Sequence, residues 1–249
     1  MKRIIFFTSL IILLFYIKIN YKNFYFDKYG YLKIQNVLSK EECNLLWKEI
    51  MYNWKTTNME AYRINIETMI GERRDLLMNF NGINRYIIKK VYNKYKNFLE
   101  KHFGTDNIGI HEYSCIISYP QTEKQPLHRD GFELNYKELV VFGILLSDVT
   151  KDMGPTEIHI GTNKWEFDVG RCLNNIESNN KNIFFGTGNI GDMIIWEGYT
   201  IHGGSTNFSN NIRPVLIMTF INLDSEFGKN KFVNSAIYPK YKNMKLSLI

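Results

Sequence analysis

Cysteine is scarce in this chain of 249 residues, and its scarcity excludes two kinds of scaffold. The three cysteines, Cys43, Cys115 and Cys172, are odd in number, and no two of them form a C-x-x-C pair. A disulfide framework needs paired cysteines, and a structural zinc site needs closely spaced ligands. We therefore expect buried free thiols and neither of these cross-links.

The chain also lacks a basic cluster and internal repeats. Its net charge is +6, but the lysines are spread along the whole sequence. Domains that bind nucleic acid usually gather their positive charge on one arm or patch, so we expect no nucleic-acid partner. Hydrophobic residues make up 45% of the chain, and this content, together with the length, favours one large domain with a sizeable core.

The one long hydrophobic run lies at the N-terminus. Two basic residues, Lys2 and Arg3, precede the stretch from Ile4 to Ile17, and no small-residue cleavage site follows it. The pattern predicts that residues 1–20 are an uncleaved signal anchor and that residues 21–249 are the domain. A membrane-associated protein with a single N-terminal pass follows from this interpretation. The alternatives are a hydrophobic helix docked on the domain, and a location in the cytoplasm or the secretory lumen.

Helices are predicted in the first half of the domain. Ser39 and Glu42 have the spacing of a capping box, and apolar residues then recur at helical spacing, so a helix should begin near Lys40. A second amphipathic helix is predicted within residues 81–103, where one face is apolar and the other carries lysines. Both patterns are typical of helices that pack on a core.

From about residue 110 onward the pattern changes to short strands. Runs such as "ELVVFGILLSD", "DMIIWEG" and "PVLIMTFINLD" are apolar and β-branched, and Gly, Pro, Asn and Asp separate them. Short strands of this kind predict a β-sandwich or barrel. The order of elements therefore predicts one α+β, mainly β, domain in which N-terminal helices support a β-barrel.

Three residues have the chemistry of a metal site. His128 and Asp130 are two positions apart, so in an extended segment both side chains point to the same side. His202 ends a later predicted strand, and two glycines follow it. Two histidines and one carboxylate are the ligand set of non-haem Fe(II) oxygenases and leave adjacent coordination positions open. We therefore predict that His128, Asp130 and His202 are the catalytic metal ligands, although the short triplet alone is weak evidence.

A candidate anion ligand follows the third metal ligand. Arg213 directly precedes Pro214 and an apolar run, so it should be extended at the start of a strand. An arginine that faces the barrel interior needs an anion, and its planar guanidinium suits a carboxylate. The alternative is an arginine at the rim in a surface ion pair. Tyr119 could also reach such a pocket, or it could be an aromatic residue of a core strand.

In this order the residues resemble a known family. His128-x-Asp130, His202 and Arg213, together with "GPTEIHIGTNKW" and "GDMIIWEGYTIHGGSTNFSNNIRPVLIMTF", are similar to the phytanoyl-CoA dioxygenase-like Fe(II)/2-oxoglutarate oxygenases, and the similarity covers residues 24–224. The resemblance implies a double-stranded β-helix, a cupin-like jelly roll. It also implies that the triad binds iron and that Arg213 holds the distal carboxylate of 2-oxoglutarate.

One departure from the family concerns that carboxylate. Some family members have a serine two residues after the last histidine, where it helps the arginine, but this chain has Gly204 there, with Ser205 next. We therefore predict that Ser205, in addition to Arg213 and Tyr119, is a cosubstrate-binding residue.

The resemblance further implies a reaction. It predicts an enzyme that uses Fe(II), 2-oxoglutarate and dioxygen to hydroxylate an unactivated C–H bond of a small-molecule or lipid-like substrate, releasing succinate and CO2. Relatives that halogenate have a small residue in place of the carboxylate ligand, so the intact Asp130 favours hydroxylation. Two alternatives stay open. One is a non-catalytic jelly-roll binding module that retains the metal and is tethered to a membrane, and the other is a protein hydroxylase resembling prolyl hydroxylases.

Overall fold

The structure of the protein is a computed structural model. The residues that it describes are 22–56, 62–63, 73–80, 82–130, 137–165, 182–229 and 246. Within these ranges, a short helix (22–29) precedes a series of strands and two long helices. The strands are β1 (Tyr31–Ile34), β2 (Tyr62–Arg63), β3 (Arg73–Leu77), β4 (Ile108–Ser118), β5 (Leu139–Leu145), β6 (Thr156–His159), β7 (Ile183–Phe185), β8 (Met193–Glu197), β9 (His202–Gly204) and β10 (Arg213–Asn222). The helices are α2 (Lys40–Thr56), α3 (Gly82–Phe103), the 3-10 helix η2 (Thr162–Lys164) and α5 (Glu226–Lys229).

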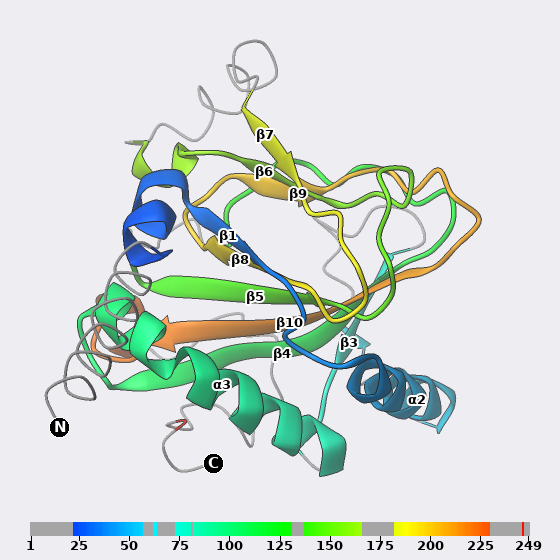
Figure 1. Cartoon of the computed structure of the whole chain (residues 1–249), viewed down its shortest axis with the longest axis horizontal. Coiled ribbons are helices and arrows are strands. Elements are labelled where there is room, and N and C mark those ends of the chain that lie inside the picture. Colours follow the sequence, from blue (N-terminus) through cyan, green and yellow to red (C-terminus); the bar gives the residue numbers. More distant parts are fainter. Residues whose placement is uncertain are drawn as a thin grey trace, which may run out of the picture.

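The strands form two sheets. Across the described residues, the large sheet has the order β1-β8-β5-β10-β4-β3-β2 and the small sheet the order β7-β6-β9, and every pairing is antiparallel. In Figure 1 the small sheet lies on one side of the large sheet, and α2 and α3 lie on the other side. This is the predicted jelly roll, in which the space between the sheets forms the barrel interior. The α+β, mainly β fold class is confirmed.

The two faces of the large sheet carry different side chains. On β4, Tyr113, Cys115 and Ile117 belong to the core under the helices, whereas Ile116 packs in the core between the sheets. On β10, Leu216, Met218 and Phe220 likewise face the helices, and Val215 and Ile217 face the barrel interior. Side chains alternate along a strand. The same alternation therefore assigns Arg213 and Ser118 to the interior face.

Both predicted helices are confirmed. Ser39 and Glu42 form the capping box, because the Ser39 amide donates to Glu42 Oε2 at 2.8 Å and the Glu42 amide donates to Ser39 Oγ at 3.2 Å. These bonds satisfy two amides that the first turn of α2 would otherwise leave unpaired. The second helix, α3, buries an apolar face that includes Ile87, Val91 and Phe98.

The cysteine prediction is confirmed where the structure describes it. Cys43 and Cys115 are buried free thiols, and Cys172 lies outside the described residues. Burial raises the pKa of the Cys43 thiol to about 11, so this thiol stays protonated at neutral pH.

The predicted membrane-associated location is wrong. Among the described residues, no helix combines the length and the apolar composition needed to cross a membrane. Residues 1–20, on which the signal-anchor prediction rests, lie outside the described residues. The domain boundary between residues 20 and 21 stays a prediction.

Candidate metal and cosubstrate site

The structure brings the three predicted metal ligands together. His128 follows β4 and pairs with His202 of β9, since each backbone amide donates to the other residue's carbonyl at 2.9 Å. The Asp130 amide donates to the Gly198 carbonyl at 3.0 Å, which places Asp130 beside the end of β8. One ligand atom from each of the three residues lies within 4.8 Å of the other two. The backbone pairing thus holds residues that are far apart in the sequence in one cluster.

A contact between Nδ1 and a backbone carbonyl orients each imidazole ring. His128 Nδ1 lies 2.8 Å from the Pro126 carbonyl, and His202 Nδ1 lies 3.0 Å from the Thr200 carbonyl. A proton on each Nδ1 leaves Nε2 as the ligand atom, which is the usual arrangement of metal-binding histidines. Nε2 of His202 is 3.3 Å from Asp130 Oδ1, and Nε2 of His128 is 4.0 Å from the same oxygen. Two nitrogens and one oxygen facing each other fit a non-haem Fe(II) ion.

The protonation states also suit metal binding. Burial and the nearby His202 lower the pKa of His128 to about 4, so its ring is neutral at pH 7. Burial opposes ionisation of Asp130, but the charges and hydrogen bonds of the neighbouring imidazoles hold its pKa at about 2. Burial lowers the pKa of His202 and Asp130 raises it, and the net shift is upward. A bound cation would take over the role of the His202 proton beside Asp130.

Arg213 lies in the barrel interior, where it meets a second arginine. Its side chain and that of Arg73 are almost fully buried. Both donate to the same hydroxyl, because Arg213 Nη2 is 2.9 Å and Arg73 Nε is 3.0 Å from Ser118 Oγ. In the sheet these three residues form one row across β10, β4 and β3.

No described carboxylate pairs with either arginine. Arg213 Nε and Arg73 Nη1 are buried without a hydrogen-bond partner. Burial, followed by the charge of Arg73, lowers the pKa of Arg213 to about 9, and burial lowers that of Arg73 to about 10. A buried charge without a counter-ion is costly. The arginine pair therefore fits an anionic ligand such as a carboxylate.

Gly204 leaves space for Arg73. A Cβ atom at Gly204 would lie 2.9 Å from Arg73 Nη2 and 2.7 Å from Gln125 Oε1. The Gly204 amide itself donates to Gln125 Oε1 at 2.8 Å. The Arg73 guanidinium thus lies in the space that the side chain of a serine at position 204 would need.

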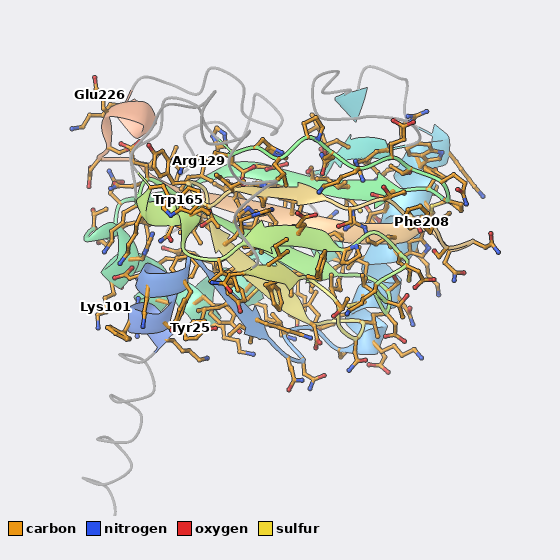
Figure 2. All side chains as sticks on the ribbon, turned by 90° about the horizontal axis from the view of Figure 1, so that it is seen from above. Tyr25, Lys101, Arg129, Trp165, Phe208 and Glu226 are labelled. Carbon is orange, nitrogen blue, oxygen red and sulfur yellow. The ribbon has the colours of Figure 1, made fainter. Side chains whose placement is uncertain are left out.

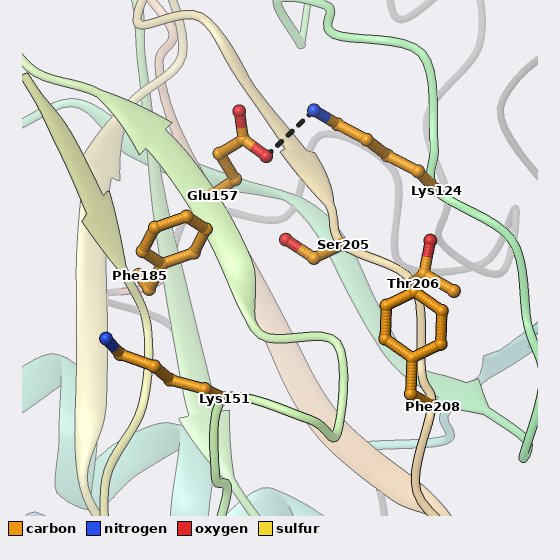
Figure 3. Close-up of a pocket in the computed structure, with 7 residues that line it drawn as sticks. All are labelled: Lys124, Lys151, Glu157, Phe185, Ser205, Thr206 and Phe208. Carbon is orange, nitrogen blue, oxygen red and sulfur yellow. Dashed lines mark ion pairs between the residues drawn. The ribbon is translucent and has the colours of Figure 1, made fainter. Parts of the chain in front are cut away.

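Ser205 and Tyr119 lie elsewhere. The Ser205 carbonyl accepts from Arg73 Nη2 at 3.4 Å, but its side chain lines a pocket with Lys124, Glu157 and Phe185 (Figure 3). The Tyr119 ring packs against Trp54 of α2, with 6.4 Å between ring centroids. Their assignment as cosubstrate residues stays a prediction, and none of these contacts supports it.

The residue between the first two ligands points away, as expected for an extended segment. Arg129 Nη2 donates to the Thr162 carbonyl at 2.9 Å, and the guanidinium lies 3.6 Å from the ring centroid of Tyr199. Arg129 Nη2 also donates to the Trp165 carbonyl at 3.4 Å. Figure 2 shows these two residues close to each other.

Solved structures share this fold, and two of the proteins are named as non-heme, alpha-ketoglutarate-dependent enzymes. The carbocyclase SnoK, described as non-heme and alpha-ketoglutarate-dependent, from nogalamycin biosynthesis is 15% identical, with a TM-score of 0.67, over 81% of this chain and 83% of that chain. The epimerase SnoN, solved in complex with Fe3+, alpha-ketoglutarate and nogalamycin RO, is 12% identical, with a TM-score of 0.66, over 82% of this chain and 84% of that chain. AviO1 from Streptomyces viridochromogenes Tue57 is 12% identical, with a TM-score of 0.63, over 82% of this chain and 94% of that chain. Identities this low establish the fold alone.

The family is established by the sequence itself. Residues 26–215 match the family model of phytanoyl-CoA dioxygenase, and the chain belongs to this family. The resemblance inferred from the motifs is therefore confirmed. Curated proteins give no match to the chain. Family membership and the His-Asp-His cluster make the protein an iron- and 2-oxoglutarate-dependent oxygenase.

Proposed function

We propose that this protein hydroxylates an unactivated C–H bond of a small-molecule or lipid-like substrate and converts 2-oxoglutarate to succinate and CO2. The observation that carries the proposal is the combination of two sites in one barrel. A cluster of two histidines and one carboxylate lies in the same interior as two buried arginines that have no carboxylate partner among the described residues.

His128, Asp130 and His202 would hold the iron. Their ligand atoms are preset by backbone pairing and by the two Nδ1 hydrogen bonds, so little reorganisation is needed when a cation binds. Fe(II) bound to these residues would supply the redox chemistry that activates dioxygen. The side chain of Asp130 is 26% exposed and that of His202 only 6%, so the cluster is more accessible to solvent at Asp130 than at His202.

Arg213, Arg73 and Ser118 would bind the cosubstrate. Arg213 offers its unpaired Nε and Arg73 its unpaired Nη1. The Ser118 oxygen already accepts from both arginines, which leaves its O–H free to donate to an anion. We assign the distal carboxylate of 2-oxoglutarate to Arg213, in line with the family pattern.

Two considerations support hydroxylation of a small substrate. The intact Asp130 occupies the position that halogenating relatives leave open for halide. SnoN was solved with nogalamycin RO, a small molecule, in the same fold. SnoK and SnoN are named as a carbocyclase and an epimerase, so the fold also accommodates other outcomes, and the experiment has to distinguish them.

The test is turnover of the full chain with Fe(II), 2-oxoglutarate and 18O-labelled dioxygen over a panel of small molecules, lipids and peptides. We expect iron-dependent succinate and a product that carries one labelled oxygen atom. A cyclised or epimerised product without the label would show that the reaction is cyclisation or epimerisation and not hydroxylation. A labelled peptide would indicate a protein hydroxylase. Failure to bind 2-oxoglutarate and to form succinate would favour the non-catalytic binding module.

A control separates loss of the metal from loss of the fold. His159→Gln changes a histidine whose Nε2 bonds Glu157 at 2.8 Å, away from the cluster. This variant should keep iron-dependent succinate formation, whereas His128→Ala should lose it.

A further inference from the structure

Trp196 makes a hydrogen bond to the carboxylate of the metal cluster. Its indole Nε1 donates to Asp130 Oδ2 at 2.9 Å. The other oxygen, Oδ1, faces the two imidazoles, at 3.3 Å from His202 Nε2 and 4.0 Å from His128 Nε2. The two oxygens of Asp130 therefore have separate partners.

The position of the indole is fixed by its surroundings. Trp196 is 5% exposed in the core between the sheets, and its ring lies 5.2 Å from that of His202, centroid to centroid. On the neighbouring strand β5, a Cβ atom at Gly143 would lie 2.9 Å from Cζ3 of the indole. The missing side chain at Gly143 thus provides the space in which the indole sits. A ring packed this closely holds its N–H in one direction.

We propose that Trp196 is a positioning residue that keeps Asp130 a one-oxygen ligand. This inference rests on the proposed function, because it assumes a cation at His128, Asp130 and His202. A carboxylate can bind a metal through one oxygen or through both. The indole N–H occupies Oδ2, and turning that oxygen toward the metal would leave a buried donor without a partner, which is unfavourable.

The number of open coordination positions depends on whether Asp130 binds the metal through one oxygen or through both. Two histidines and a one-oxygen carboxylate leave three positions of an octahedral ion open. In the proposed function, these positions would be available to 2-oxoglutarate and dioxygen. A carboxylate that binds through both oxygens would fill one of the three, so cosubstrate and dioxygen would compete for the remaining positions.

The test uses Mn(II), which occupies oxygen and imidazole sites without starting the reaction. Full-length protein and its Trp196→Phe variant are loaded with Mn(II), and the metal-bound waters are counted from the broadening of the Mn(II) electron paramagnetic resonance lines in 17O-labelled water. We expect three waters in the wild type and fewer in Trp196→Phe. We also expect 2-oxoglutarate to bind the Mn(II)-loaded variant about 10-fold more weakly, in the range known for residues that orient metal ligands.

Two further samples keep the test decisive. Trp54→Phe removes an indole on the helix-covered face of the sheet and should leave both values unchanged. Replacement of Trp196 by its benzothiophene analogue keeps the shape and removes only the N–H donor, so it serves if the phenylalanine variant does not fold. Equal water counts and equal 2-oxoglutarate affinity in the wild type and both Trp196 replacements would overturn the inference. A wild type that binds no Mn(II) would instead overturn the proposed function.

Discussion

Two groups of residues in the barrel interior differ in how completely the chain satisfies its own polar groups: the metal end is His128, Asp130 and His202, and the arginine end is Arg73, Arg213 and Ser118. At the metal end, both imidazoles have a backbone partner for Nδ1, and Asp130 has the indole of Trp196. At the arginine end, two buried guanidinium groups share the hydroxyl of Ser118 and still have unpaired N–H groups. The metal end is thus preorganised, whereas the arginine end is electrostatically incomplete until an anion binds. Changes at the first end should therefore affect metal binding, and changes at the second should affect the cosubstrate.

The largest effect is expected at the metal end. Asp130→Ala removes the only carboxylate ligand of the cluster and should lower metal affinity by more than about 100-fold, beyond the range known for residues that merely orient ligands. Titration with Mn(II) measures this, with His159→Gln as the control. Tight metal binding by Asp130→Ala would show that another group is the carboxylate ligand.

At the arginine end, Arg213→Gln should weaken 2-oxoglutarate binding by about 30-fold or more, as expected for loss of one partner of a buried charge pair. Metal affinity should stay near the wild-type value, since the side chain of Arg213 donates its hydrogen bond to Ser118 and not to a metal ligand. The control ligand is 2-oxobutanoate, which lacks the distal carboxylate and should bind the wild type and the variant alike. If Arg213→Gln weakened the binding of both ligands equally, the arginine would not be the group that binds the distal carboxylate.

A smaller effect is expected where the two arginines are packed together. Gly204→Ser places a side chain against Arg73 Nη2 and should cost about 1–3 kcal/mol in unfolding free energy. Combining it with Arg73→Gln relieves the contact with Arg73 but not the 2.7 Å contact with Gln125 Oε1, so the two changes should be partly non-additive in chemical denaturation. Additive effects would mean that Arg73 moves aside without cost.

A further effect, on the pH dependence of stability, is expected at Glu112. Glu112 is partly buried, and desolvation followed by the charges of Asp75 and Asp130 raises its pKa from 4.5 to about 8, while Ser114 and Thr219 donate to its carboxyl group. The folded state therefore keeps a proton that the unfolded chain releases. This contribution to stability is complete below about pH 4.5 and is lost as the pH rises through about 8.

Glu112→Gln should consequently gain stability relative to the wild type as the pH rises. The comparison is made by thermal unfolding of metal-free protein at pH 5 and pH 8.5, because a bound cation would favour the ionised form. A difference between the two proteins that does not change with pH would contradict the raised pKa.

The sequence predicted the residues whose chemistry is distinctive. His128, Asp130 and His202 could be found because few residue types bind iron, and Arg213 because Pro214 makes its backbone extended. Arg73 and Ser118 could not be found in this way. Their roles depend on the register that places them beside Arg213 in neighbouring strands, and the sequence does not specify that register.

Strand alternation bears on two of the predictions that stay open. Residues 202 and 204 share a face of β9, so the following Ser205 belongs to the opposite face, where its side chain is found. In the same way, Ser118 faces the interior and the next residue, Tyr119, packs toward α2. The alternation that paired His128 with Asp130 applies equally to these neighbours. The membrane prediction had a different origin, because it rested on residues 1–20 alone.

The most direct test of the central claim is an anaerobic titration of the Fe(II)-loaded full-length protein with 2-oxoglutarate. Chelation of the keto acid by iron held at His128, Asp130 and His202 should produce a visible charge-transfer absorption that saturates at one equivalent. Arg213→Gln should shift the same absorption to higher 2-oxoglutarate concentrations. Absence of the absorption in protein that has bound Fe(II) would contradict the assignment of this barrel interior as an iron and 2-oxoglutarate site.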